Sequence, residues 1–442
     1  MGAAIGSLRP RLLILADSPG AFAMLCGISF LERLLRVAQR IGFRQATISS
    51  DSVDLIRAQF AEHSWARAEL SLEFQEHARG PATIGDISRC LKLMGPLDPD
   101  RALVIAAAYY CDGRLLRTMA EGTTNTVLID SKLPQNCALL WEDRKPRTCG
   151  WFCGTALLDQ EWLSKQDPRA GLIDALLLNA DAGRLASLDA SRQPTYVPDL
   201  RKNLRPVCFP APPPPRRRLA ECLLQDAAQN GTLDVPALVH APIENWLVAH
   251  LWKTSIRPNQ ITFVTMLVGL SVTLLYATGH LWLGTILALI VGILDGLDGK
   301  LARIKVETTE LGKWEHALDY IVELSWWTAL SHHFYANGES PNAYLMLLLL
   351  FGSDLVDRSA RRSVKQRLGR NLDDVAPFDR VVRGVGGRRN TYIWIFTLGL
   401  ALGAAANAFV ALCWWGAATA AVHLFRALQI GRAFSRRAVR PG

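Results

Sequence analysis

Apolar runs fill the C-terminal half of this 442-residue chain and constrain its fold more than any other feature. A helix needs about 20 predominantly apolar residues to cross a bilayer, and the uncharged run that begins at Ile261 approaches that length. Several later runs are shorter or contain polar residues, so each one alone is also compatible with a buried helix of a soluble protein. Together they predict an all-α polytopic membrane domain with about six transmembrane helices, at 261–278, 281–294, 314–336, 343–356, 392–406 and 408–424.

Lysine and arginine are distributed unevenly between these runs. They precede the first run, lie between the second and third, are dense between Arg358 and Arg389, and recur after Arg426. The other connections contain neither residue. Because basic loops remain on the cytoplasmic side, we expect a multi-pass protein of the cell inner membrane with both termini in the cytoplasm. The formal net charge of +9 is consistent with basic loops that lie against an anionic membrane leaflet. Nucleic-acid binding is the other explanation of this charge, but the sequence lacks the combined aromatic and basic surface expected for it.

Four carboxylates lie beside the apolar sequence, in the run ILDGLDGKLARIKVETTELGKWEHALDY. Asp295 and Asp298 have i, i+3 spacing and Glu315 and Asp319 have i, i+4 spacing, so each pair shares a helix face. Charges near a bilayer are costly and indicate a functional site with a compensating cation. Oxygen ligands of this kind suit Mg²⁺ or Mn²⁺. The alternative is a set of ordinary charges on solvated helix ends.

This run resembles the signature of the CDP-alcohol phosphatidyltransferase family, D-x-x-D-G-x-x-A-R, followed after about eight residues by G-x-x-x-D-x-x-x-D. The matching residues are Asp295, Asp298, Gly299, Ala302, Arg303 and Gly312. The resemblance implies a CDP-alcohol donor whose pocket is lined by Gly299, Ala302 and Arg303.

The second half of the signature departs from this pattern. A strict count from Gly312 places His316 and Tyr320 at the acidic positions, whereas a register one residue shorter places Glu315 and Asp319 there. We prefer the shorter register because DGKLAR followed by EHALD is similar to the DGKxAR and DHxxD motifs of the choline and ethanolamine phosphotransferase branch. In this register Tyr320 faces away from the carboxylates, and His316 either orients Glu315 or packs within the helix.

The predicted site then has defined roles. Two ions of Mg²⁺ or Mn²⁺ are expected, bound by Asp295, Asp298, Glu315 and Asp319. Asp319 is also the candidate general base nearest the acceptor. Three arginines near the fifth run, Arg383, Arg388 and Arg389, either bind an acceptor phosphate or serve only as topology-setting charge.

The N-terminal half has a different pattern, in which short β-like runs such as LLILAD and ALVIAAAYY alternate with amphipathic stretches. Alternation of this kind predicts a layered α/β domain. A segment containing APPPPRRR follows and is typical of a stiff linker. We therefore expect an α/β domain at 1–205, a Pro/Arg-rich linker and helix at 206–240, and the membrane domain at 241–442.

The order of these N-terminal runs is similar to sugar-phosphate nucleotidyltransferase domains. Such domains hold a nucleoside triphosphate with a Gly-rich loop containing Arg and a downstream Lys, and a metal ion with an Asp after the central strand. Here the loop position contains Ser18-Pro19-Gly20-Ala21-Phe22, and Ala106–Ala108 follow the strand. Asp112 is either a remaining ligand or an ordinary loop residue. We therefore expect this domain to lack nucleotidyltransferase activity.

The favoured function is transfer of a phospho-alcohol or phosphatidyl group from a CDP-alcohol to an acceptor hydroxyl with release of CMP, in phospholipid or phosphodiester biosynthesis. The expected partners are the CDP-alcohol donor, an alcohol or lipid acceptor and membrane lipids, and a homodimer is left open. One alternative is a bifunctional cytidylyltransferase and transferase. The other is a non-catalytic membrane scaffold, against which the intact first half of the acidic signature argues.

Overall fold

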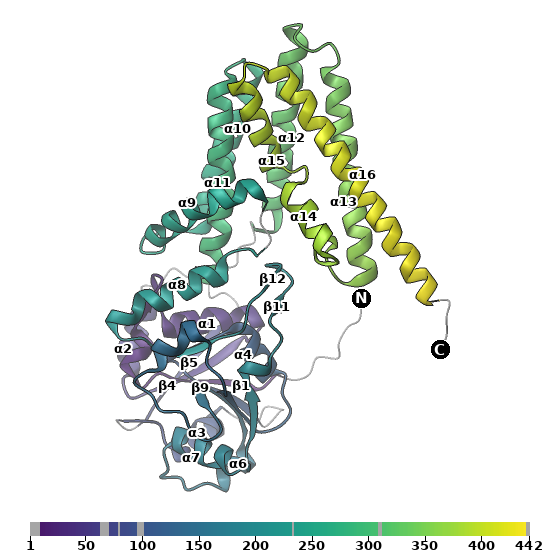
Figure 1. Ribbon diagram of the computed structural model, residues 1–442. Helices are drawn as coiled ribbons and strands as arrows, with labels where there is room; N and C mark the ends of the chain where they lie inside the picture. The colour runs from purple at the N-terminus through teal and green to yellow at the C-terminus, as the bar shows by residue number, and fades with distance from the viewer. Residues whose placement is uncertain are drawn as a thin grey trace. The chain divides into compact units, whose positions relative to one another are not determined.

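The computed structural model describes residues 9–61, 70–77, 80–94, 101–231, 234–307 and 312–438, without the side chains of 59, 61, 312–316 and 434–438. Two compact units are present (Figure 1). The first contains the chain up to Thr195 and Leu204–Ala227, and the second contains Tyr196–Asn203 and the chain from Ala228 onward.

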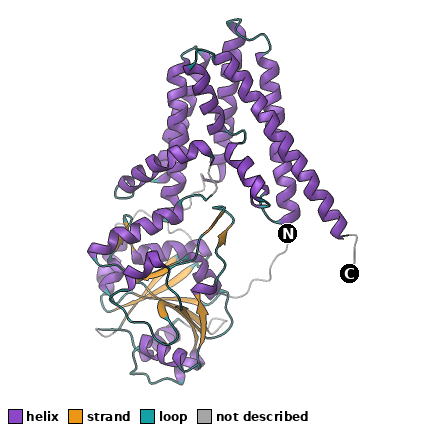
Figure 2. Cartoon of the chain, viewed as in Figure 1, coloured by secondary structure: helices purple, strands orange, loops and turns teal. Residues whose placement is uncertain are grey.

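The first unit is built around a seven-stranded sheet in the order β10-β8-β9-β6-β1-β4-β5. Strand β9 pairs antiparallel with β6 and β8, whereas the other neighbours pair in parallel. The strands are β1 (Arg11–Leu15), β4 (Gln45–Ser50), β5 (Ser71–Glu76), β6 (Arg101–Ala106), β8 (Thr126–Asp130), β9 (Trp151–Asp159) and β10 (Ala186–Asp189). The larger helices are α1 (Phe30–Ile41), α2 (Val53–Ala61), α3 (Ile84–Leu93), α4 (Gly113–Ala120) and α7 (Leu172–Asp181). The α/β prediction for this region is confirmed (Figure 2).

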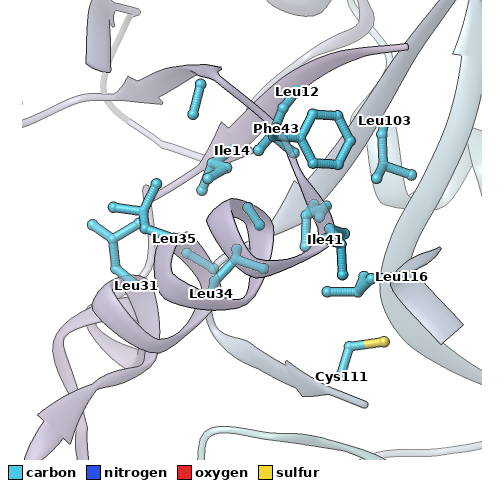
Figure 3. Packing of buried hydrophobic residues seen from close by; sticks show 14 of the residues in the cluster. Leu12, Ile14, Leu31, Leu34, Leu35, Ile41, Phe43, Leu103, Cys111 and Leu116 are labelled. Atoms are coloured by element: carbon cyan, nitrogen blue, oxygen red, sulfur yellow. The ribbon is translucent and has the colours of Figure 1, made fainter. Parts of the chain in front are cut away.

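The core of this unit lies where α1 covers the sheet (Figure 3). Leu31, Leu34 and Leu35 recur at helical spacing, so one face of α1 is apolar and packs near Leu12 and Ile14 of β1. Ser29 starts the helix by accepting a hydrogen bond from the Glu32 amide at 3.1 Å, and Gly42 ends it at a φ of 96°.

The segment with the expected linker continues the first unit. Strand β13 (Cys208–Pro210) pairs antiparallel with β7 (Tyr109–Cys111), and helix α8 (Arg217–Ala228) follows. By contrast, the hairpin of β11 (Tyr196–Val197) and β12 (Lys202–Asn203) belongs to the second unit. Contiguous sequence is therefore divided between the two units.

The second unit is mostly helical in its described part. Its helices are α9 (Val235–Leu251), α10 (Pro258–Ala277), α11 (Leu281–Lys305), α12 (Gly312–Ala336), α13 (Ala343–Leu368), α14 (Pro377–Val385), α15 (Arg389–Ala401) and α16 (Ala405–Ala438). Helix α9 lies across one end of the bundle (Figure 1) and contacts α11. Aromatic side chains including Trp326, Phe334, Phe396 and Phe409 fill the bundle core.

Three described helices are long and apolar enough to cross a membrane: Pro258–Ala277, Leu281–Lys305 and Ala405–Ala433. The other three segments expected to cross are also helical. However, α12 and α13 carry charged residues such as Glu323 and Asp354, and α15 has only 13 residues. A mostly helical unit with three candidate spans is thus established, and six spans remain a prediction.

Two helices extend further than the apolar runs indicated. Helix α11 continues beyond Leu294 to Lys305, so Asp295 and Asp298 lie inside it. Helix α13 continues to Leu368 before Gly369 ends it at a φ of 64°, and α14 occupies part of the remaining basic segment. Polar residues with adequate helix propensity prolong both helices after their apolar stretches end.

Candidate functional site

A cavity of about 650 Å³ in the second unit collects most of the charged residues that the sequence singled out. Helices α9, α11, α12, α13, α14 and α15 contribute to its lining. The acidic lining residues are Asp234, Glu244, Asp295, Asp298, Asp319, Glu323 and Asp354. The basic lining residues are Arg201, Lys300, Arg303, Arg358, Arg361, Arg383, Arg388 and Arg389.

Helix α11 presents the first acidic pair to this cavity. Asp298 is buried and accepts hydrogen bonds from the Thr262 hydroxyl at 2.8 Å and the Gly299 amide at 2.5 Å. Asp295 forms an ion pair with Arg389, whose Nη2 lies 2.6 Å from its Oδ2. Asp298 thus accepts hydrogen bonds from a hydroxyl and a backbone amide, and Asp295 is paired with a guanidinium.

The remaining signature residues of α11 lie one turn further along. Arg303 lines the cavity and donates from Nε to the Ala228 carbonyl at 2.8 Å. Gly299 also lines it, and a Cβ there would meet the Arg303 guanidinium at 3.4 Å. Ala302 is half-buried and is not among the lining residues. The glycine and arginine thus share one face of the cavity.

Helix α9 packs a buried ion pair against the same motif. Lys300 Nζ lies 2.6 Å from Glu244 Oε2 and 3.0 Å from Asn245 Oδ1. Glu244 is 6% exposed and Lys300 2%. Burial raises the pKa of the Glu244 carboxyl, which Lys300 opposes. A Cβ at Gly296 would approach Glu244 Oε1 to 2.4 Å, so a larger residue at this position would displace the Glu244 carboxylate. Neither Glu244 nor Lys300 was singled out from the sequence.

Helix α12 brings Asp319, Tyr320 and Glu323 to the cavity. Glu315 and His316 lie on the same helix, but their side chains are outside the described part of the structure. Glu323 was missed by the sequence analysis, although it follows Asp319 at i, i+4 spacing and so shares its helix face. The structure therefore offers a second acidic pair, Asp319 and Glu323.

The expected orientation of Tyr320 is wrong. Its side chain lines the cavity, and its hydroxyl donates to Asp354 Oδ2 at 2.7 Å. Arg358 lies over the ring, 4.1 Å from its centroid, and pairs with the same aspartate at 2.7 Å. A strong hydrogen bond and a cation–π contact with α13 hold the tyrosine here.

The three arginines expected near the fifth run all line the cavity, although from different elements. Arg383 is on α14, Arg388 caps the start of α15, and Arg389 is its first residue. Arg383 Nε lies 3.6 Å from Asp373 Oδ2, and Asp373 is 2% exposed. Burial lowers the pKa of Arg383 to about 10, and the neighbouring Arg201 contributes. Within the described residues, Arg383 Nη1 and Arg388 Nη2 make no hydrogen bond.

The donor chemistry of this cavity fits a hard divalent cation. Among the described side chains, no three His, Cys, Asp or Glu residues form a ready group around one ion. Mg²⁺ commonly needs only one or two carboxylates, with substrate phosphates and water completing its shell. Asp295, Asp298, Asp319 and Glu323 provide oxygen ligands around one space, so the residues present suit such an ion together with a phosphorylated substrate.

In the first unit, the positions where a nucleotidyltransferase domain would bind nucleotide and metal hold residues that cap helices or end a strand. Ser18 caps a short 3₁₀ helix (Pro19–Phe22) by accepting from the Gly20 amide at 3.3 Å. Ala106 ends β6. Asp112 is half-buried, caps α4, and is held by Arg114 at 2.8 Å. Asp112 is therefore already engaged by a cap and an ion pair.

Residues 255–422 match the family model described as CDP-alcohol phosphatidyltransferase. They form a CDP-alcohol phosphatidyltransferase domain. This domain starts after α9 and after the β11–β12 hairpin, so both elements are additional to it.

Among curated proteins, the bifunctional IPC transferase and DIPP synthase of Aquifex aeolicus is 33% identical over 159 residues. The alignment covers 35% of each chain, so this protein spans about a third of that relative's length.

Two solved structures are similar to parts of this chain. HddC from Yersinia pseudotuberculosis is 13% identical and covers 48% of this chain and 99% of its own, with a TM-score of 0.33. Phosphatidylinositol phosphate synthase from Mycobacterium tuberculosis, with CDP-DAG bound, is 17% identical and covers 43% of this chain and 94% of its own, with a TM-score of 0.34.

Proposed function

We propose that this protein is an integral membrane transferase that moves a phospho-alcohol or phosphatidyl group from a CDP-alcohol to an acceptor hydroxyl and releases CMP. The observation that carries the proposal is one cavity of the CDP-alcohol phosphatidyltransferase domain. It is lined by the signature residues Asp295, Asp298, Gly299 and Arg303 and by Asp319. Carboxylates on α11 and α12 and arginines on α13, α14 and α15 line the same cavity, a set of groups suited to binding a phosphate ester with a metal ion.

The reaction is a single displacement at the β-phosphorus of the donor. The acceptor oxygen forms a new bond to this phosphorus, and the bond from phosphorus to the bridging oxygen of CMP breaks. CMP leaves with the bonding electron pair, and the acceptor hydroxyl proton passes to the Asp319 carboxylate. Asp319 suits this role because it is a carboxylate that lines the cavity from α12.

The signature residues bind and orient the donor. Gly299 lets the diphosphate approach the backbone of α11, and Arg303 holds phosphate oxygens. Ala302, which is half-buried on the same helix, is the third signature residue assigned to the donor. Asp295, Asp298, Asp319 and Glu323 would hold Mg²⁺ or Mn²⁺, with Glu315 as the further ligand expected from sequence. A bound ion of this kind neutralises charge on the diphosphate and on the departing CMP.

Arg383, Arg388 and Arg389 form the acceptor side of the proposed site. Arg383 and Arg388 each have a guanidinium nitrogen without a hydrogen bond among the described residues, which favours a role in anion binding over topology alone. An acceptor bearing a phosphate group would satisfy these donors.

The proposed setting is the cell inner membrane, with six spans and both termini in the cytoplasm. The apolar helices and the uneven distribution of Lys and Arg support it. A cysteine introduced at Arg370 should resist an impermeant maleimide in intact cells and react after permeabilisation. Labelling from outside would contradict both the orientation and a cytoplasmic site. A homodimer remains an open expectation.

The bifunctional alternative has one specific observation in its favour: the Aquifex aeolicus relative is named as a bifunctional enzyme. Against it, the first unit has Ser18 and Ala106–Ala108 where charged residues are expected, and Asp112 is engaged by Arg114. We therefore retain a first unit, expected at 1–205, without cytidylyltransferase activity. A non-catalytic scaffold would have no need for the charged cavity.

CMP release by the purified full-length protein tests the proposed function. Two donor classes, CDP-diacylglycerol and CDP-linked polar alcohols, should be offered with a panel of free and phosphorylated alcohols. We expect CMP release from one class, loss of that activity with EDTA, and recovery with Mg²⁺ or Mn²⁺. No CMP from either donor class, with the protein folded, would contradict the proposal.

A further inference from the structure

The β11–β12 hairpin places a residue from outside the family domain in the transferase cavity. The chain leaves the first unit after Thr195 and rejoins it at Leu204, and the eight residues between belong to the second unit. Tyr196 donates a hydrogen bond to Asp374, and the Gly231 amide donates to the Leu200 carbonyl at 2.7 Å. These contacts fix the hairpin to described parts of the second unit at both its base and its turn.

Arg201 is the hairpin residue that lines this cavity. It ends the turn between the paired residues Val197 and Lys202, and its φ is 52°. Left-handed backbone is disfavoured for residues with a Cβ, and turns normally use glycine or asparagine there. Arg201 is thus held in a disfavoured backbone conformation at a position where it lines the cavity.

Asp373 connects Arg201 to the arginines of the proposed acceptor side. Its Oδ2 lies 3.7 Å from Arg201 Nη1 and 3.6 Å from Arg383 Nε. One buried carboxylate is therefore shared by two guanidinium groups at this wall. Burial and the nearby Arg201 both lower the pKa of Arg383, as expected when two cations are held together. A phosphate group bound here would relieve this repulsion.

We propose that Arg201 binds a phosphate group of a substrate in the transferase cavity, so that the hairpin completes a phosphate site shared with Arg383. The inference rests on the proposed function for the identity of the cavity, but phosphate binding itself requires no turnover. The phosphate has two sources in the proposed reaction: the diphosphate of the CDP-alcohol donor or a phosphomonoester on the acceptor. Either source presents the same oxygen atoms to the guanidinium.

Calorimetric titration of the full-length protein in detergent with inorganic phosphate tests this assignment. We expect Arg201→Gln to weaken phosphate binding by roughly 10- to 100-fold, because a charge-assisted contact is lost. Arg201→Gly should weaken it equally while relieving the left-handed backbone, which separates loss of the guanidinium from loss of folding. Lys202→Gln, which removes a charge from the same hairpin outside the cavity lining, should leave phosphate affinity unchanged.

Saturating CDP identifies the source of the phosphate. CDP fills the donor diphosphate position, so inorganic phosphate that still binds reports an acceptor site, whereas displaced phosphate reports the donor site. Wild-type phosphate affinity in both Arg201 variants would overturn the inference, as would an equal loss in Lys202→Gln. The two proposals fail separately: normal phosphate binding without any CMP release contradicts only the transferase, and CMP release with phosphate binding indifferent to Arg201 contradicts only the hairpin site.

Discussion

The two units use their charged residues in opposite ways. In the first unit, charged side chains stabilise the fold: Asp112 caps a helix beside Arg114, and Asp130 is paired with Arg205 at 2.5 Å. In the second unit, Asp319, Glu323 and Arg388 line a cavity of about 650 Å³. Helices of both units need caps and packing, but a fold has no need to gather many charges around one space. The comparison distinguishes charged residues that stabilise the fold from charged residues placed to bind a ligand.

The largest expected effect comes from the cavity carboxylate with the proposed base role. Asp319→Asn keeps the side-chain volume and removes the charge, and we expect CMP release to fall by about 10²–10⁴-fold with the melting temperature unchanged. Asp112→Asn is the matched change in the first unit, and it should leave CMP release unchanged. Equal activity losses in the two variants would remove the distinction between the units.

A second test concerns which acid shares the cavity with Asp319. Glu323 lines the cavity four residues beyond Asp319, so Glu323→Gln should lower CMP release by about 10²-fold, as loss of a group that binds a metal ion or substrate would. Glu315→Gln should cost less than this. An active Glu323→Gln beside an inactive Glu315→Gln would favour Glu315, the acid expected from sequence, as the partner of Asp319. Because Tyr320 also lines the cavity and holds Asp354, Tyr320→Phe should now have a measurable effect.

The Glu244–Lys300 pair refines this comparison, because it is a pair of charges in the second unit that we expect to stabilise the packing of α9 against α11. Removal of one partner leaves a buried unpaired charge, so Glu244→Gln or Lys300→Met should each cost about 3 kcal/mol of stability. The double variant should recover part of that loss. Thermal unfolding of all three in detergent measures the coupling, and strictly additive losses would show that the pair does not act as a unit.

The smallest expected effect is no activity at all from the first unit. Full-length protein incubated with CTP and phosphorylated alcohols should release no pyrophosphate, because Ser18 and Ala106 stand where charged groups are expected. The full chain is the proper sample, since β13 pairs with β7 and a fragment ending at 205 would lose that strand. Metal-dependent pyrophosphate release would favour the bifunctional alternative.

Sequence patterns predicted the parts of this protein that depend on local composition. The β-like runs became the central strands, and the apolar run from Ile261 became α10. The residues Asp295, Asp298, Gly299 and Arg303 were singled out from their types and spacing and from the family signature that they resemble, and the structure places them around one cavity. The signature did not indicate Glu323. The second acidic pair was assigned from similarity to a sequence motif of one family branch, and the i, i+4 spacing of Asp319 and Glu323 on the helix was not considered.

Other features depend on tertiary contacts that no local pattern encodes. The orientation of Tyr320 follows from Asp354 and Arg358 on α13, which are more than 30 residues away. The Glu244–Lys300 pair depends on α9 packing against Gly296. The boundary between the units follows strand pairing by β13 and insertion of the β11–β12 hairpin, whereas the proline-rich composition indicated a linker.

Phosphorus NMR of one reaction tests the central claim most directly. Purified full-length protein, Mg²⁺, a CDP-alcohol and an acceptor alcohol are mixed, and all phosphorus signals are followed together. The account predicts that CMP and a new phosphodiester appear in equal amounts as the donor diphosphate disappears, and that Asp319→Asn abolishes all three changes. An unchanged CDP-alcohol with wild-type protein, while CTP and a phosphorylated alcohol are converted to pyrophosphate, would contradict it.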